Sequence, residues 1–203
     1  MKIKVCGLNP TRDVQLCIDL KIQYLGFVFY NKSPRNVNLS DIKILSKYNK
    51  KNSTFVAVTV NPVNEFIEKY LMGNFEFIQL HGSETKERLM EIKNMGFKII
   101  KAIKVKEERD IEKYKEFSNA DIILFDTPGM EQSLKFPEKL IAKLPLGKKY
   151  ALAGSISEDN VSNLSKLGVN FFDLSSSLES QLGYKDHLKI KKFVHKINEL
   201  KKK

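Results

Sequence analysis

The sequence predicts an α/β protein in which eight parallel strands and eight helices alternate around a closed (β/α)8 barrel, the TIM-barrel fold. Eight short apolar or β-branched runs alternate with eight segments of helical hydrophobic period. The runs begin 21 to 30 residues apart, which leaves room for one helix and two loops between neighbouring strands. An open doubly wound sheet is the alternative. It is disfavoured because Gly7-Leu8-Asn9-Pro10, after the first run, is not the fingerprint G-x-G-x-x-G.

The expected elements fill residues 1–203, which we expect to form a single domain. The strands are expected to begin near Ile3, Tyr24, Thr54, Phe77, Lys98, Asp121, Tyr150 and Phe171. The helices are expected over Thr11–Leu20, Ser40–Tyr48, Val63–Leu71, Thr85–Met95, Glu107–Phe117, Pro137–Lys143, Asn160–Leu167 and His187–Leu200. Ser40 and Thr85 are the expected N-caps of their helices, and Gly96 and Gly168 stand where two helices should end.

Composition places the chain among soluble proteins. Apolar residues make up 42% of the 203 residues and charged residues 29%, which is typical of a globular chain and not of a disordered one. The longest apolar runs are far shorter than the ~20 residues that span a bilayer. Since the first residues also lack the apolar core of a signal peptide, we expect a cytoplasmic protein with no membrane partner.

The net charge of +11 raises the question of nucleic-acid binding. Only four of the 35 basic residues are arginines, and the lysines are spread along the whole chain. Nucleic-acid surfaces generally use arginine forks and aromatic stacking platforms, so we expect no nucleic-acid partner. A basic RNA-binding protein on a barrel scaffold stays as the alternative of another class, and a steep dependence of RNA binding on salt would favour it.

Polar residues near the ends of the expected strands form the candidate site, because barrel active sites lie at the C-terminal ends of the strands. Side chains alternate along a strand, so Lys4 on the first strand should face the barrel axis. The inward polar residues nearest the strand ends are Cys6 on the first strand, Gln79 and His81 on the fourth, Asp126 on the sixth and Asp173 on the eighth. Each one alone has a structural interpretation, as a small buried thiol, a helix cap or a core histidine. Burying all of these polar groups at one end of the barrel costs free energy, which favours a functional role for the set.

Neither a metal site nor a cofactor motif is visible in the sequence. The three histidines are scattered, and no pair of ligands has metal-binding spacing. We therefore expect no metal and no cofactor. Cys17 shares a helical face with Val14 and Ile18, and we expect it in the core.

The motifs together resemble the phosphoribosylanthranilate isomerase family, a family of enzymes in tryptophan biosynthesis, an aromatic amino-acid pathway. The resemblance runs from end to end. It is carried by Lys4-Val5-Cys6-Gly7, Gly26-Phe27-Val28-Phe29, Lys32-Ser33-Pro34-Arg35, Val60-Asn61, Gln79-Leu80-His81-Gly82, Lys101-Ala102, Phe125-Asp126-Thr127, Leu152-Ala153-Gly154, Asp173-Leu174-Ser175-Ser176, Glu179 and Gly183-Tyr184-Lys185-Asp186.

The resemblance implies an intramolecular oxidoreductase, an isomerase that performs the Amadori rearrangement of N-(5-phosphoribosyl)anthranilate. It implies that Cys6 is the general base, Asp126 the general acid, and Arg35 the ligand of the anthranilate carboxylate. The other substrate-binding residues it implies are Gln79, His81 and Asp173. The partner would be a small phosphosugar–anthranilate substrate, and the enzyme would be a monomer or a homodimer.

The chemistry needs these residue types. Opening the sugar ring requires a proton on the ring oxygen, and a protonated Asp126 supplies it. The resulting iminium makes the C2 proton acidic, and a thiolate removes it. Lys4 is a candidate cation for that thiolate. A planar arginine fork suits a carboxylate.

The phosphate end departs from the family pattern. Where the family has a glycine-rich loop, this chain has Gly129–Lys135, which includes Glu131. We expect the phosphate site between the loops after the last two strands, built from Gly154, Ser155, Ser176 and Ser177. Serine can replace glycine in such a loop if its φ stays negative, and we expect a short helix to open at Ser177-Leu178-Glu179. In the alternative, Ser175–Ser177 merely cap the turn into the final helix. These departures leave two interpretations of the chain, an active isomerase or a relative with an altered substrate or reduced activity.

Overall fold

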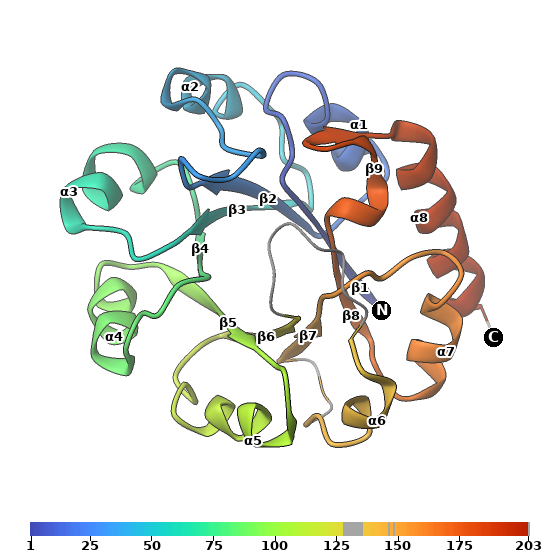
Figure 1. Ribbon diagram of the computed structural model, residues 1–203. Coiled ribbons are helices and arrows are strands. Elements are labelled where there is room, and N and C mark those ends of the chain that lie inside the picture. The colour runs from blue at the N-terminus through green and yellow to red at the C-terminus, as the bar shows by residue number, and fades with distance from the viewer. Residues whose placement is uncertain (128–135, 146, 148, 203) are drawn as a thin grey trace.

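The computed structural model, which describes residues 1–127, 136–145, 147 and 149–202, contains a closed barrel of eight parallel strands in chain order (Figure 1). Strand β1 pairs with both β2 and β8, so the sheet has no open edge and the doubly wound alternative is excluded. The barrel strands are β1 (Lys2–Cys6), β2 (Tyr24–Phe29), β3 (Thr54–Thr59), β4 (Phe77–Leu80), β5 (Lys98–Lys104), β6 (Ile122–Asp126), β7 (Tyr150–Leu152) and β8 (Phe171–Leu174).

Helices surround the barrel, and each lies in a segment where the sequence predicts one (Figure 1). The α-helices are α1 (Val14–Asp19), α2 (Ile42–Leu45), α3 (Asn64–Phe66), α4 (Lys86–Asn94), α5 (Glu108–Ile111), α6 (Glu138–Ile141), α7 (Val161–Lys166) and α8 (His187–Lys201). Three of these α-helices adjoin helices of another type. The 3-10 helix η1 (Leu39–Asp41) precedes α2, the π-helix η2 (Ile67–Leu71) follows α3, and the 3-10 helix η3 (Glu112–Lys115) follows α5.

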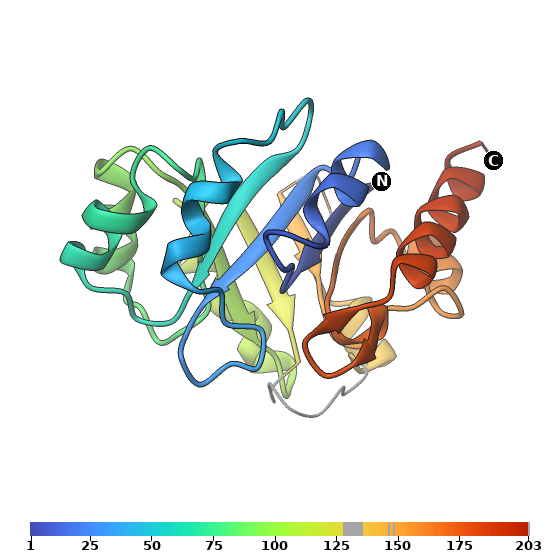
Figure 2. The same ribbon diagram turned by 90° about the horizontal axis from the view of Figure 1, so that it is seen from above.

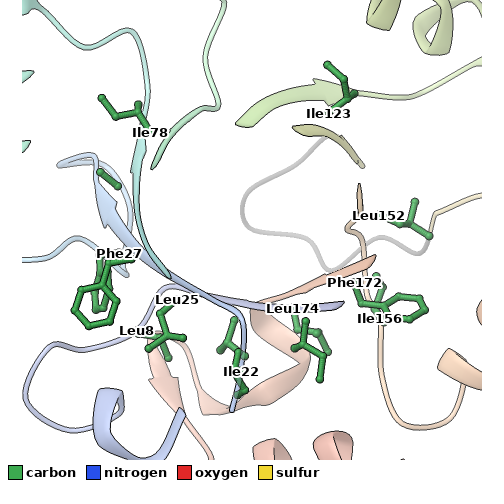
Figure 3. Close-up of a cluster of buried hydrophobic side chains, with 14 of the residues drawn as sticks. Leu8, Ile22, Leu25, Phe27, Ile78, Ile123, Leu152, Ile156, Phe172 and Leu174 are labelled. Atoms are coloured by element: carbon green, nitrogen blue, oxygen red, sulfur yellow. The ribbon is translucent and has the colours of Figure 1, made fainter. Parts of the chain in front are cut away.

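Alternation along the strands divides the apolar core into two parts. Side chains such as Phe27, Ile78 and Ile123 point away from the barrel axis and pack beneath the helices (Figure 3). Their neighbours in sequence, such as Val28 and Phe77, fill the barrel interior in a separate cluster. This alternation is the pattern expected for strands that are buried on both faces.

Aromatic rings fill the N-terminal end of the barrel interior. Tyr24 stacks on Phe171 with the ring centroids 5.1 Å apart and meets the edge of Phe77 at 5.7 Å. These rings belong to the first residues of β2, β4 and β8. The polar inward residues therefore lie farther along the strands, toward the C-terminal end of the barrel.

The helix ends show which local predictions hold. Thr85 is the N-cap of α4, since its side chain accepts a hydrogen bond from the backbone N–H of Arg88. Gly96 and Gly168 follow α4 and α7 with φ of +99° and +91°, as a helix end requires. The prediction for Ser40 is wrong, because Ser40 lies inside the turn of η1, which begins after Asn38.

The connection from β8 to α8 contains an extra hairpin. A single turn, η4 (Ser176–Leu178), leads into the antiparallel strands β9 (Glu179–Gln181) and β10 (Tyr184–Lys185). The hairpin lies at the same end of the barrel as the loop that follows β2 (Figure 2). No helix among the described residues is both long and apolar enough to cross a membrane.

Candidate active site

One pocket opens at the C-terminal ends of the strands, with about 1050 Å³ of empty space. It brings together residues from loops and strand ends that are up to 171 positions apart in the chain. Every residue that the sequence predicts for the site lines it, namely Cys6, Arg35, Gln79, His81, Asp126, Gly154, Ser155, Asp173, Ser176 and Ser177.

Cys6 ends β1 and is half-buried at the pocket wall. Gly26, its neighbour on β2, leaves it space, because a Cβ there would come within 3.3 Å of the Cys6 sulfur and 3.1 Å of Lys4 Nζ. Burial raises the pKa of the Cys6 thiol, while the cations of Lys4 and Lys185 act in the opposite direction. The resting thiol therefore keeps its proton at neutral pH, and an additional positive charge is needed to form the thiolate.

Lys4 lies one layer below Cys6, as expected, and its own partner is Asp173. The two residues are neighbours in the β1–β8 register, and Lys4 Nζ donates to both carboxylate oxygens, at 3.0 and 2.9 Å. Burial opposes the charge on Lys4, but Asp173 and Cys6 outweigh it and raise the pKa of Lys4. Lys4 thus remains a cation beneath the thiol.

Asp126, at the end of β6, faces His81 across the pocket. His81 Nε2 lies 3.2 Å from Asp126 Oδ2, and the other carboxylate oxygen accepts from the backbone N–H of Thr127 at 2.8 Å. Gln79 Nε2 lies 3.0 Å from His81 Nδ1. If the amide nitrogen donates there, the neutral imidazole carries its proton on Nε2 and donates it to Asp126. Gln79 Oε1 is buried and has no partner within the described part of the chain.

Arg35 lies on the loop after β2, which folds back along that strand through the hydrogen bond from Val37 N–H to the carbonyl of Val28. Its guanidinium binds Glu179 through Nε and Nη2, each 2.7 Å from a carboxylate oxygen. Arg35 Nη1 has no hydrogen-bond partner among the described residues. Glu179 therefore holds the Nε–Nη2 edge of the guanidinium, and the residue as a whole lines the pocket.

The four residues expected to hold a phosphate lie around one side of the pocket. Gly154 and Ser155 both have positive φ, +100° and +47°. Ser155 therefore does not meet the condition of a negative φ under which serine readily replaces glycine, and its backbone adopts a conformation that favours glycine. The Ser155 hydroxyl is buried and has no hydrogen-bond partner in the described residues.

The turn expected at Ser177-Leu178-Glu179 begins one residue earlier, at Ser176, and Glu179 belongs to β9 instead. Ser175 stands at the N-cap position of η4 without a side-chain cap hydrogen bond, so the alternative that Ser175–Ser177 cap the turn into the final helix stays a prediction. The final helix α8 itself is capped by Asp186, through the N–H groups of Leu188 and Lys189. The predictions for Gly129–Lys135, with Glu131, lie outside the described residues.

Sequence reasoning missed Glu179 and Lys185 as parts of the site, although both stand in motifs of the family resemblance. They lie six positions apart on the two strands of the β9–β10 hairpin, on either side of Gly183. A glycine between two short polar strands indicates a hairpin, but the partner of Glu179 is 144 positions away and leaves no local pattern. Cys17 lies in the core as expected, fully buried, and burial raises the pKa of its thiol to about 12.

The arrangement combines a proton acceptor, a proton donor and an anion-binding end in one pocket. A thiol with a cation beneath it faces the same space as a carboxyl group that contacts an imidazole. Arg35 can bind a carboxylate, and the loop residues after β7 and β8 can bind a second anion. Such a pocket suits proton transfers on a doubly anionic small molecule.

Comparisons with known proteins agree with this chemistry. A family model described as "N-(5'phosphoribosyl)anthranilate (PRA) isomerase" matches residues 3–196. The N-(5'-phosphoribosyl)anthranilate isomerase of Legionella pneumophila (strain Corby) is 34% identical over 204 residues, which cover 97% of each chain. That of Thermoanaerobacter pseudethanolicus is 33% identical over 204 residues, covering 97% of this chain and 98% of the relative.

Solved structures extend the likeness to three dimensions. The phosphoribosyl anthranilate isomerase of Thermotoga maritima has a TM-score of 0.86 at 26% identity, covering 98% of this chain and 99% of that one. A further isomerase was solved with reduced 1-(o-carboxyphenylamino)-1-deoxyribulose 5-phosphate. It has a TM-score of 0.82 at 27% identity, with 98% and 99% covered.

Proposed function

Because the chain belongs to the N-(5'-phosphoribosyl)anthranilate isomerase family, we propose that Cys6 is the general base and Asp126 the general acid of its reaction. The chain is an isomerase of tryptophan biosynthesis, and it catalyses the Amadori rearrangement of N-(5-phosphoribosyl)anthranilate to 1-(o-carboxyphenylamino)-1-deoxyribulose 5-phosphate. The observation that carries the two roles is that Cys6 and Asp126 face one pocket from β1 and β6, with Arg35 at its rim.

In the first step, Asp126 gives a proton to the ring oxygen, the C1–O bond breaks, and the nitrogen lone pair forms an iminium. The Asp126 carboxylate that results is met by His81 and by the N–H of Thr127. Held 3.2 Å away, His81 positions the carboxyl group. A general acid in this place contributes about 10²–10⁴-fold to the rate.

In the second step, the Cys6 thiolate removes the proton from sugar C2, and its electrons move toward the iminium to give an enolamine. Loss of the C2 hydroxyl proton and protonation of C1 then complete the ketone product. The iminium adds one positive charge to those of Lys4 and Lys185, and this added charge favours the thiolate over the thiol that burial stabilises in the resting enzyme.

We propose that Arg35 binds the anthranilate carboxylate with the end of its guanidinium that Glu179 leaves open. Gln79, His81 and Asp173 are proposed to contact the sugar. Of these, Asp173 is already neutralised by Lys4, which suits a group that accepts hydrogen bonds from sugar hydroxyls. We further propose that the chain acts without nucleic acid as one domain, a monomer or a homodimer in the cytoplasm, and a dimeric relative from Thermotoga maritima supports the second state.

Turnover by the whole chain tests the function directly. Incubation with N-(5-phosphoribosyl)anthranilate should cause the substrate's anthranilate fluorescence to fall with time, and the chain has no tryptophan to interfere. Failure of this signal together with salt-dependent RNA binding would contradict the isomerase assignment. Failure alone would indicate a relative with an altered substrate or reduced activity.

If the substrate phosphate binds near Ser155 and Ser177, a negative charge introduced there should weaken substrate binding. Ser177→Asp should raise the KM for the phosphorylated substrate at least about tenfold, because a carboxylate there repels the phosphate. Ser180→Asp, on an exposed position of β9 three residues away, is the matched control and should leave KM unchanged. Crystals grown with sulfate should hold an anion on the amides of Ser155 and Ser177. If both aspartate variants behave alike and the site stays empty at high sulfate, the phosphate assignment is wrong.

A further inference from the structure

We propose that Glu179 is a positioning residue that aims Arg35 at the substrate's carboxylate, and that the β9–β10 hairpin serves to hold Glu179 in place. The inference rests on the proposed role of Arg35. It assigns a function to Glu179 and to the extra hairpin between β8 and α8, neither of which takes part in the proton transfers.

The hydrogen bonds define the orientation of the guanidinium. Glu179 occupies the Nε–Nη2 edge of Arg35 in two parallel contacts of 2.7 Å. A bidentate contact of this kind fixes the plane of the guanidinium as well as its position. Arg35 lines the pocket, so the end formed by Nη1 and Nη2, which Glu179 leaves open, is the one that would offer a second pair of N–H groups to a planar carboxylate.

The three charged groups of the cluster around Glu179 leave one positive charge without a partner anion. Glu179 is 8% exposed, and its Oε1 also accepts from Lys185 Nζ at 2.6 Å. Arg35, Glu179 and Lys185 together carry a net charge of +1. Buried charges are costly unless they are balanced. A single substrate carboxylate on Arg35 completes that balance, whereas a neutral aniline ring does not.

The Glu179 carboxylate stays ionised over the working pH range. Burial would raise the pKa of Glu179, but Arg35 and Lys185 overcome it and lower that pKa to about 2. Burial lowers the pKa of Lys185, and the contact with Glu179 opposes this change. The carboxylate therefore remains available to Arg35 at any pH at which the enzyme is assayed.

Backbone groups of the hairpin and of the loop after β1 pack against Glu179 and Arg35. Gly183 N–H lies 3.3 Å from Glu179 Oε2, and Gly183 has a φ of +80°. A Cβ on Gly183 would approach the carbonyl oxygen of Pro34 to 2.8 Å, so the hairpin tip packs directly on the loop that carries Arg35. On the other side, Arg35 crosses Gly7, where a Cβ would come within 2.5 Å of Arg35 Cδ. The position of Arg35 is thus set by close backbone packing that only glycines allow.

The test compares two ligands that differ only in the carboxylate. The first is reduced 1-(o-carboxyphenylamino)-1-deoxyribulose 5-phosphate, and the second is the same molecule with a phenylamino group that lacks the carboxylate. Binding of each is measured by calorimetry on the whole chain. Glu179→Gln should lower the affinity for the first ligand about 10- to 100-fold and change the affinity for the second by no more than about twofold. Equal weakening of both ligands, or of neither, would overturn the inference.

Glu84→Gln is the matched control. Glu84 is also buried, 5% exposed, and also binds a lysine, Lys101, at 2.6 Å, but it does not touch Arg35. Its loss should change the affinities of the two ligands by the same factor. If Glu179→Gln does not fold, Glu179→Asp keeps the charge and shortens the reach, and the same selective weakening of the carboxylate ligand is expected.

Arg35→Met separates this inference from the proposed function. If Arg35 binds the carboxylate, Arg35→Met lowers the affinity only for the ligand that has the carboxylate. Adding Glu179→Gln to Arg35→Met then causes no further loss of that affinity. If Arg35→Met discriminates between the ligands but Glu179→Gln does not, Arg35 keeps its role and the inference about Glu179 is wrong. If Arg35→Met does not discriminate either, the proposed role of Arg35 fails and the inference falls with it.

Discussion

Cys6→Ser is expected to lower kcat/KM for N-(5-phosphoribosyl)anthranilate by about 10²–10⁴-fold while the protein remains folded. Serine has nearly the volume of cysteine, so Gly26 and Lys4 keep their places around it. Its hydroxyl, however, does not lose a proton at a useful pH, even with Lys4, Lys185 and the iminium nearby. The measurement is steady-state turnover followed by fluorescence, with thermal unfolding to check the fold.

The second cysteine provides the control. Cys17 is fully buried, and burial raises the pKa of its thiol to about 12, so it should contribute nothing to proton transfer. Cys17→Ala should therefore keep its activity per folded molecule, although its melting temperature falls. At alkaline pH, where the Cys6 thiol can ionise, iodoacetamide should modify Cys6 in preference to the buried Cys17, and the reduced product analogue should protect Cys6. Turnover by Cys6→Ser at nearly the parent rate would exclude Cys6 as the base.

The strands could be predicted closely because their sequence signal is local. Tyr24, Thr54, Phe77, Lys98, Tyr150 and Phe171 begin strands as expected, since a strand buried on both faces must be a short apolar run. The same alternation places Cys6, Gln79, Asp126 and Asp173 on the inner face. The α-helices before α8 are shorter than expected. Their apolar period continues into turns such as η3, which pack on the barrel without forming α-helical hydrogen bonds.

The contacts that tune the site could not be predicted, because they join distant segments. Arg35 and Glu179 are 144 residues apart, and nothing around either one indicates the other. The pairing of Lys4 with Asp173 follows only once β1 and β8 close the barrel. The positive φ of Ser155 could not be predicted either, because serine is uncommon in that conformation and no propensity rule expects it there.

Asp126→Asn is expected to lower kcat by about 10²–10⁴-fold, the usual cost of losing a general acid. Asparagine keeps the shape, and its oxygen still accepts from the N–H of Thr127. It has no proton to give to the ring oxygen. Its amide also places N–H groups against His81 Nε2, which carries a proton itself when Gln79 donates to Nδ1, so this contact turns from attractive to repulsive.

Binding of an open-chain ligand distinguishes a chemical role of Asp126 from a structural one. The reduced product analogue has no ring to open, so it makes no demand on an acid. Asp126→Asn should therefore bind it within a few-fold of the parent affinity while turnover falls by orders of magnitude. His81→Asn, which removes the imidazole but leaves the carboxyl group in place, should lose less activity than Asp126→Asn. If the analogue's affinity falls as steeply as kcat, or if His81→Asn is the more damaging change, then Asp126 is not the group that protonates the ring oxygen.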